Sequence, residues 1–295
     1  MNTALAERRA TARWRAFLNE RAPLPALLVI AFAQSLSAQV LVAPAATPLR
    51  ALAAALPLAA LLVLLRLMDE VKDHRKDIVA HPERPLPRGL IAVEEARRAV
   101  VGLAIALLGV SLALGFVAGA VPALLYAACV GWAWLMYREF YAPQALDRNA
   151  FVHALSHQVI VLPMYFFAAA MAAPERAFDA PVIWFALAGL GASFGYEVAR
   201  KLDPEADPVL GTYRRRHGTG AAAVAILVSL LLASLAAQRI GVEVVAWPLA
   251  ALTAVVLPIG LRDARRHRWV EGAAGLHAFG QMLAPALLHY LAGGP

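Results

Sequence analysis

The amino-acid sequence predicts an all-α membrane protein, a bundle of nine transmembrane helices. Of its 295 residues, 61% are hydrophobic and only 16% are charged, whereas soluble domains carry about 25% charged residues. Apolar stretches of about 20 residues, the length that spans a bilayer as a helix, recur along the whole chain. The composition excludes a soluble enzyme, a disulfide-rich secreted protein, a nucleic-acid-binding protein and a disordered chain.

Nine apolar runs, each bounded by charged residues, Pro or Gly, are expected to span the bilayer. Because nine is odd, the two termini should lie on opposite faces of the membrane. The connections after odd-numbered spans are short and nearly uncharged, whereas those after even-numbered spans hold almost all the ionisable residues. The predicted spans are residues 24–43, 49–68, 98–118, 120–137, 150–171, 181–199, 219–237, 242–261 and 272–292.

The positive charges predict the orientation. Of the 27 Lys and Arg residues, 23 lie in the N-terminal segment or in the long connections. Since such residues are retained in the cytoplasm during insertion, we expect the N-terminus and the charged loops to be cytoplasmic, in a multi-pass protein of the cell inner (plasma) membrane. Residues 1–22, which contain five Arg with Trp14 and Phe17, are expected to form an interfacial segment, followed by one transmembrane domain over 23–295. Topology explains the net charge of +7, and no nucleic-acid partner is expected.

A first acidic cluster follows directly on the second apolar run. Asp69, Asp73 and Asp77 are spaced by four, so a continuing helix would carry them on one face, about 40° apart, with Glu70 beside Asp73. Carboxylates this close need neutralising cations, and their hard oxygen ligands suit Mg²⁺ that also coordinates substrate phosphates. The alternative is a solvated, salt-bridged helix extension, in which each ion pair contributes roughly a few tenths of a kcal/mol.

A second acidic pair, Asp203 and Asp207, repeats this spacing after the sixth span. Taken alone, Asp203 before Pro204 is typical of a helix N-cap followed by Pro at the first helical position. Two acidic pairs at the same-side ends of two even-numbered spans instead favour opposite walls of one metal–diphosphate site. We therefore expect Asp73 and Asp203 to face each other.

The central part of each predicted span contains no Asp, Glu, Lys or Arg. Ion-coupled transporters usually need ionisable groups near the bilayer midplane. The charge distribution predicts a polar site at the cytoplasmic surface, above a deep apolar interior.

The chain resembles the UbiA superfamily of intramembrane prenyltransferases. Three features carry the resemblance: the nine spans, the acidic motif followed by RPLPRG, and the second DxxxD after span six. The resemblance covers essentially the whole chain. It implies a bundle of the UbiA prenyltransferase type, which holds a prenyl diphosphate through Mg²⁺ and transfers the prenyl group to a lipophilic, commonly aromatic, acceptor with release of diphosphate. The family's first motif, NDxxDxxxD, here has Asp in place of Asn and Glu in place of the first Asp. The implied metal ligands are Asp69, Glu70, Asp73, Asp77, Asp203 and Asp207, of which Asp73, Asp77, Asp203 and Asp207 are the implied catalytic residues.

Cations near these motifs are candidates to bind the diphosphate, although each also fits the positive-inside rule. Many members of the family have a YxxxK motif after span four, whereas here Tyr137 is followed four residues later by Tyr141, so only the neighbouring Arg138 offers a cation. The candidate diphosphate-binding residues are Arg84, Arg88, Arg138, Arg200, Lys201 and Arg214.

Polar residues in or near the spans are weaker candidates for an acceptor or prenyl pocket. The alternative is interhelical hydrogen bonding for the polar side chains, and an interfacial or core position for the aromatic residue that ends span four. These candidates are Gln34, Tyr137, His153, His157 and Tyr196.

Three functions remain open from the sequence. The first is the Mg²⁺-dependent prenyltransferase. The second is an intramembrane terpene cyclase on the same scaffold, in which the substrate's own double bond captures the allylic cation. The third is a lipid-binding or transport protein that has kept the bundle without the reaction.

Overall fold

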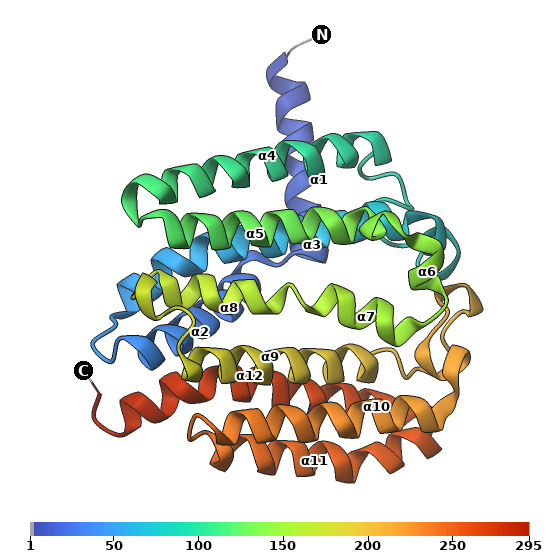
Figure 1. The fold of residues 1–295 in the computed structure, drawn as a ribbon. Helices are drawn as coiled ribbons and strands as arrows, with labels where there is room; N and C mark the ends of the chain where they lie inside the picture. The colour runs from blue at the N-terminus through green and yellow to red at the C-terminus, as the bar shows by residue number, and fades with distance from the viewer. Residues whose placement is uncertain (1–2, 295) are drawn as a thin grey trace.

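The structure, a computed structural model, describes residues 3–294 and the side chains of residues 10–263 and 265–294. Within residues 3–294 the chain forms helices and connecting loops without any strand. Most of the helices run side by side, nearly parallel to one another, across the molecule, whereas the N-terminal helix crosses their direction at one end of the bundle (Figure 1). They are α1 (Thr3–Arg21), α2 (Leu24–Val42), α3 (Pro48–Ala80), α4 (Val93–Val117), α5 (Ala120–Tyr137), α6 (Pro143–Asp147), α7 (Ala150–Gln158), α8 (Val161–Ala170), α9 (Ala180–Ala199), α10 (Tyr213–Gln238), α11 (Glu243–Arg262) and α12 (His267–Leu291), with 3₁₀ turns η1 (Glu139–Tyr141), η2 (Pro174–Arg176), η3 (Pro208–Leu210) and η4 (Ala264–Arg266).

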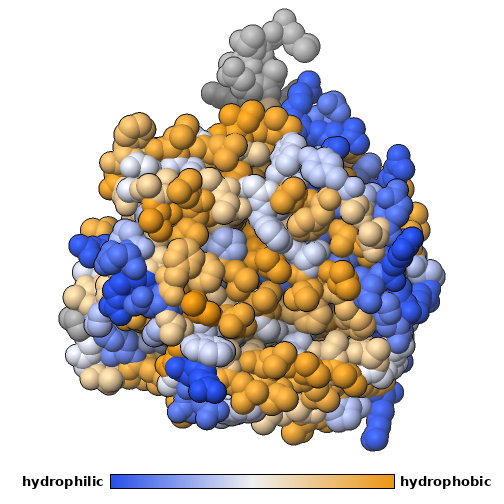
Figure 2. All heavy atoms as spheres, viewed as in Figure 1, coloured by the Kyte–Doolittle hydropathy of each residue, from blue (hydrophilic) through white to orange (hydrophobic). Residues whose placement is uncertain are grey.

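The predicted all-α membrane fold is confirmed. Within residues 3–294, eight helical segments are long and apolar enough to cross a membrane, with α7 and α8 counted as one segment. The ninth predicted span corresponds to α12, which is not among these eight segments and packs against α2, α9 and α11. A broad band of hydrophobic residues crosses the visible face, and hydrophilic residues gather along its right edge, where α6 and the long loops lie (Figure 2).

Helix α3 extends well past the predicted end of span two. Thr47 caps its start, accepting a hydrogen bond from the backbone N–H of Arg50, and Pro48 occupies the first turn. The helix ends at Ala80, since His81 precedes Pro82 and a residue before proline disfavours helical geometry. Its 33 residues span about 50 Å, longer than the hydrocarbon thickness of about 30 Å. The acidic part of α3 therefore projects beyond the apolar band.

The predicted fifth span is broken into two helices, α7 and α8. In a continuous α-helix the N–H of residue 163 would donate a hydrogen bond to the carbonyl oxygen of Val159, but Pro163 has no backbone N–H. The N–H of Leu162 donates to Val159 instead, at 3.0 Å. The break places several residues around it on the wall of a central cavity.

Helix α1 is tied to the bundle by ion pairs. Arg13 pairs with Glu95 of α4, at 3.1 Å, and the indole N–H of Trp14 donates to the same carboxylate. Arg21 pairs with the buried Glu70 of α3. The predicted interfacial segment 1–22 is thus helical over Thr3–Arg21, while its residues 1–2, and residue 295 of the predicted domain 23–295, lie outside the described residues.

Candidate active site

The bundle encloses a cavity of about 730 Å³. Residues from the N-terminal and C-terminal halves of the chain line it together, from α2, α3, α5, α6, α7, α8, α9, α10 and α12 and from the turns η1 and η3. One part of the lining is charged. The other is apolar and includes Leu62, Leu65, Val161, Met164, Phe279 and Met282.

The charged part carries five carboxylates and five Lys or Arg side chains. Three of these carboxylates form ion pairs with four of the cations. The two that remain are Asp69 and Asp73, one helical turn apart on α3. Neither accepts a hydrogen bond from, or forms an ion pair with, any residue that the structure describes, although the charges of Lys72 and Arg200 act on Asp69. Free carboxylate oxygens in this arrangement are suitable ligands for Mg²⁺.

The other two acidic residues of the first motif lie outside the cavity lining. Glu70 faces α1, where Arg21 pairs with its carboxylate. Asp77 is only 2% exposed and pairs with Arg84 at 2.7 Å. The rotation of about 40° for each step of four residues explains the divergence, because Asp77 is turned by about 80° from Asp69.

Asp203 and Asp207 lie in the loop between α9 and α10. The carboxylate of each accepts a hydrogen bond from the backbone N–H of the residue two positions later in the chain. Asp203 accepts from the N–H of Glu205 at 2.9 Å, and Asp207 accepts from the N–H of Val209 at 2.8 Å. Asp203 lines a separate hollow of about 250 Å³, whereas Asp73 lines the central cavity. The structure therefore does not bring Asp73 and Asp203 into one cavity.

Two of the six candidate diphosphate cations line the central cavity. Arg200 and Lys201 both pair with Glu197, each at 2.6 Å, and the carboxylate of Glu197 is 9% exposed. The other four candidates have different surroundings. Arg84 pairs with Asp77, Arg88 pairs with Glu20, Arg138 lies over the ring of Tyr141, and Arg214 lines the smaller hollow.

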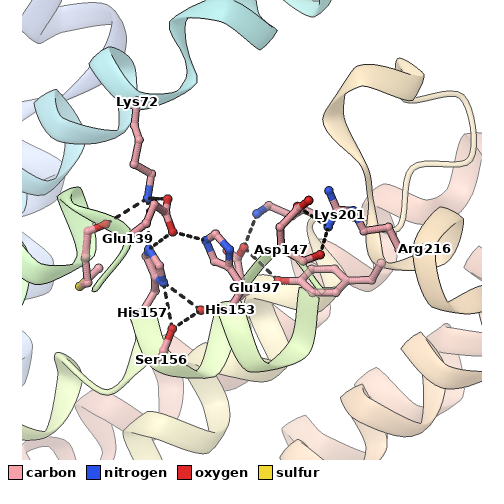
Figure 3. A network of polar contacts seen from close by, with 11 residues as sticks. Lys72, Glu139, Asp147, His153, Ser156, His157, Glu197, Lys201 and Arg216 are labelled. Carbon is pink, nitrogen blue, oxygen red and sulfur yellow. Dashed lines mark hydrogen bonds and ion pairs between the residues drawn. The ribbon is translucent and has the colours of Figure 1, made fainter. Parts of the chain in front are cut away.

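A polar network connects α3, η1 and α7 on the cavity wall (Figure 3). Lys72 Nζ lies 2.8 Å from Glu139 Oε1 and 3.1 Å from His157 Nε2. The second oxygen of Glu139 lies 3.5 Å from His153 Nε2. Burial acts to raise the pKa of Glu139, but the hydrogen bond and charge of Lys72, with the two histidines, hold that pKa below its ordinary value. Glu139 is therefore a carboxylate at neutral pH.

Four of the five predicted pocket residues line the cavity: Gln34, His153, His157 and Tyr196. Tyr137 is not among its lining residues and packs beside Trp134, with ring centroids 5.6 Å apart.

Sequence reasoning did not select several residues on the cavity wall. The 3₁₀ turn that presents Glu139 has no simple sequence signature. Arg216, at the start of α10, pairs with Asp147 at 2.9 Å, and both line the cavity. His153 and His157, by contrast, were among the predicted residues, and their spacing of four places them on one helix face. The charged lining residues missed are Lys72, Lys76, Glu139, Asp147, Glu197 and Arg216.

Comparison with models of protein families and with curated proteins finds no match. Among solved structures, the fold is similar to that of a digeranylgeranylglyceryl phosphate synthase in membranes. The TM-score is 0.62 at 13% sequence identity, over 94% of this chain and 99% of that chain. At this identity the likeness shows a shared fold, and it extends over nearly the whole of both chains.

Proposed function

We propose that the protein is an intramembrane prenyltransferase, which moves a prenyl group from a prenyl diphosphate to a lipophilic, aromatic acceptor and releases diphosphate. One observation carries the proposal: two unpaired carboxylates and several cations line one part of a cavity whose remainder is largely apolar. A prenyl diphosphate has the same division, a highly charged head on an apolar chain. The shared fold with a digeranylgeranylglyceryl phosphate synthase supports the same assignment.

Asp69 and Asp73 are proposed to hold Mg²⁺ at the charged part of the cavity. Bound there, Mg²⁺ would neutralise the charge that grows on the diphosphate as the allylic carbon–oxygen bond breaks. Arg200 and Lys201 are proposed to donate hydrogen bonds to the phosphate oxygens, in exchange for their present partner Glu197.

The apolar walls are proposed to hold the prenyl chain and to keep water away from the allylic cation. Gln34 is the proposed contact for the acceptor. Its side-chain nitrogen is buried, has no hydrogen-bond partner among the described residues and belongs to the cavity lining. An amide N–H in this position can donate to a phenol or carbonyl oxygen.

The same proposal includes the location of the protein. Residues 1–22 are proposed to be an interfacial segment and residues 23–295 the catalytic domain. The charged loops are proposed to face the cytoplasm of an inner-membrane protein, because 23 of 27 Lys and Arg residues lie in them or in the N-terminal segment.

The test is release of diphosphate by the purified protein with Mg²⁺, using prenyl diphosphates of several chain lengths, with and without aromatic acceptors. Asp69→Asn and Asp73→Asn are expected to lower turnover by about 10²–10³-fold, the scale seen when a charge-stabilising group is lost. Glu175→Gln, at an exposed position outside the cavity lining, is the matched control and should keep full turnover. The absence of diphosphate release with every substrate would refute the proposal. Release without any acceptor, with a cyclised product, would identify a cyclase instead.

The role of the second acidic pair is tested in the same assay. If Asp203 and Asp207 take part in metal binding, as the family resemblance implies, Asp203→Asn and Asp207→Asn should lower turnover as strongly as Asp73→Asn. If they only cap turns in the loop between α9 and α10, both variants should retain turnover within a few-fold and lower stability instead.

A further inference from the structure

Three potential metal ligands meet on the cavity wall, beside the proposed magnesium site. They are Glu139 of η1 and His153 and His157 of α7, and their ligand atoms all lie within 4.8 Å of one another. The second oxygen of Glu139 lies 3.5 Å from His153 Nε2 and 3.9 Å from His157 Nε2. In a tetrahedral zinc site, with metal–ligand distances of about 2.0–2.1 Å, ligand atoms are about 3.3 Å apart. Small side-chain rotations would therefore bring this group to ligating distance.

The hydrogen bonding of His157 favours a metal ligand. Its Nδ1 lies 2.9 Å from the backbone carbonyl oxygen of His153. A carbonyl oxygen only accepts, so Nδ1 carries the proton and the lone pair of Nε2 points to Glu139 and Lys72. Histidines that bind metals are commonly oriented by this kind of bond to their other ring nitrogen.

The backbone of η1 is strained where it presents the carboxylate. Glu139, Phe140 and Tyr141 have φ values of 49°, 51° and 55°. Such positive values are uncommon for residues other than glycine and cost of order 1–3 kcal/mol each. Strain of this kind persists when surrounding contacts enforce it, and here it directs Glu139 to the two histidines (Figure 3).

We propose that Glu139, His153 and His157 form a binding site for one divalent transition-metal ion of the Zn²⁺ type, distinct from the Mg²⁺ site at Asp69 and Asp73. Two imidazole nitrogens and one carboxylate oxygen are a ligand set that such ions prefer, whereas Mg²⁺ prefers oxygen ligands alone. The proposal does not depend on prenyl transfer.

Lys72 would compete with this ion for two of its ligands, Glu139 and His157. Its ammonium group lies 2.8 Å from Glu139 and 3.1 Å from His157, and 3.4 Å from the backbone carbonyl oxygen of Met136. A metal ion bound by the same carboxylate and imidazole would displace this group. Because Lys72 also lines the cavity, the displaced ammonium could turn toward a bound anion.

The test is metal binding by the full-length protein, purified without a polyhistidine tag and stripped of metal by a chelator. Equilibrium dialysis with Zn²⁺, and the visible absorption of Co²⁺, should show one bound ion with the spectrum of a nitrogen- and oxygen-ligated site. Glu139→Gln, His153→Ala and His157→Ala should each weaken Zn²⁺ binding by at least about 100-fold. His289→Ala, which removes a histidine from the distant C-terminal part of α12, is the matched control and should leave binding unchanged.

Lys72→Met gives a result that misfolding would not produce. By removing the competing charge it should tighten Zn²⁺ binding by about tenfold or more. Asp73→Asn and an excess of Mg²⁺ should leave Zn²⁺ binding unchanged, because they act on the other site. The proposal is overturned if Zn²⁺ binding is undetectable, or if it persists at wild-type affinity in the His153 and Glu139 variants, or if Lys72→Met weakens it.

Discussion

Asp77 and Arg84 form an ion pair that joins the end of α3 to the loop that follows it. The carboxylate is 2% exposed and the guanidinium is 25% exposed. Removing one partner of a buried pair leaves an uncompensated charge, which typically costs about 3–5 kcal/mol. The pair therefore fixes the path of the RPLPRG segment as it leaves the membrane helix.

Arg84→Met is expected to lower the free energy of unfolding by about 3–5 kcal/mol, measured by denaturant unfolding in detergent. The double variant Asp77→Leu with Arg84→Met should recover much of that loss, since neither charge remains. If Arg84 instead contacts the diphosphate, Arg84→Met would raise KM for the prenyl diphosphate without lowering stability.

Glu20 and Arg88 form a more exposed pair between α1 and the same segment, at 2.7 Å. The hydrogen bond from Arg88 holds the pKa of Glu20 below its ordinary value of 4.5. A carboxylate with a lowered folded-state pKa stabilises the fold above its unfolded pKa, and this contribution disappears as the pH falls through the folded-state value.

Glu20→Gln should therefore be less stable than the wild type at pH 7, and the difference should shrink as the pH falls below the ordinary pKa of the carboxyl and through its lower folded-state pKa. Thermal unfolding at several pH values measures it. The effect should be much smaller than that of Arg84→Met, because solvent screens an exposed pair. A difference that grows at acid pH would contradict the assigned ion pair.

Residue spacing predicted part of the cavity lining but did not reveal the surroundings of the other acidic residues. A step of four residues puts Asp69 and Asp73 on one helix face, and both line the cavity. The same rule does not reveal which long-range partner reaches each carboxylate. Arg21 pairs with Glu70 across 49 residues, and Glu139 depends on a turn with positive φ values. Such contacts depend on tertiary packing, which local periodicity does not encode.

Helices α9 and α10 approach closely through small residues. A Cβ added to Gly191 would lie 3.1 Å from the Cβ of Ala233 and 3.2 Å from the backbone oxygen of Ser229. Backbone atoms cannot move aside as a flexible side chain can. These helices also carry Glu197 and Arg216 at their cavity ends, so their separation influences the site.

Gly191→Ala is expected to destabilise the protein by about 1–3 kcal/mol through overpacking. Gly102→Ala is the matched control on α4, where an added Cβ meets nothing within 4 Å. There the helix propensity of Ala should stabilise the fold by up to about 1 kcal/mol. Chemical denaturation in the same detergent measures the free energy of unfolding of both variants. Equal changes in the two variants would argue against the close contact at Gly191.

At the scale of the whole molecule, the sequence was most informative. The apolar runs predicted the long helices, because a bilayer demands helical segments of nearly fixed length. The break between α7 and α8 and the extension of α3 escaped this reasoning, since hydropathy reports neither a proline-induced break nor where a helix ends in water. The distribution of Lys and Arg also predicts how the protein is oriented in the membrane.

This orientation is tested by cysteine labelling in intact cells with a membrane-impermeant maleimide. The wild type should not react, because its one cysteine, Cys129, is fully buried in α5. Glu175→Cys lies at an exposed position in the short connection between α8 and α9 and should be labelled from outside. Glu83→Cys lies in the charged loop after α3, where the side chain is 72% exposed, and should react only after the membrane is permeabilised. The reverse pattern would place the charged part of the cavity outside the cell, away from the cytoplasmic pool from which we expect a prenyl diphosphate to enter.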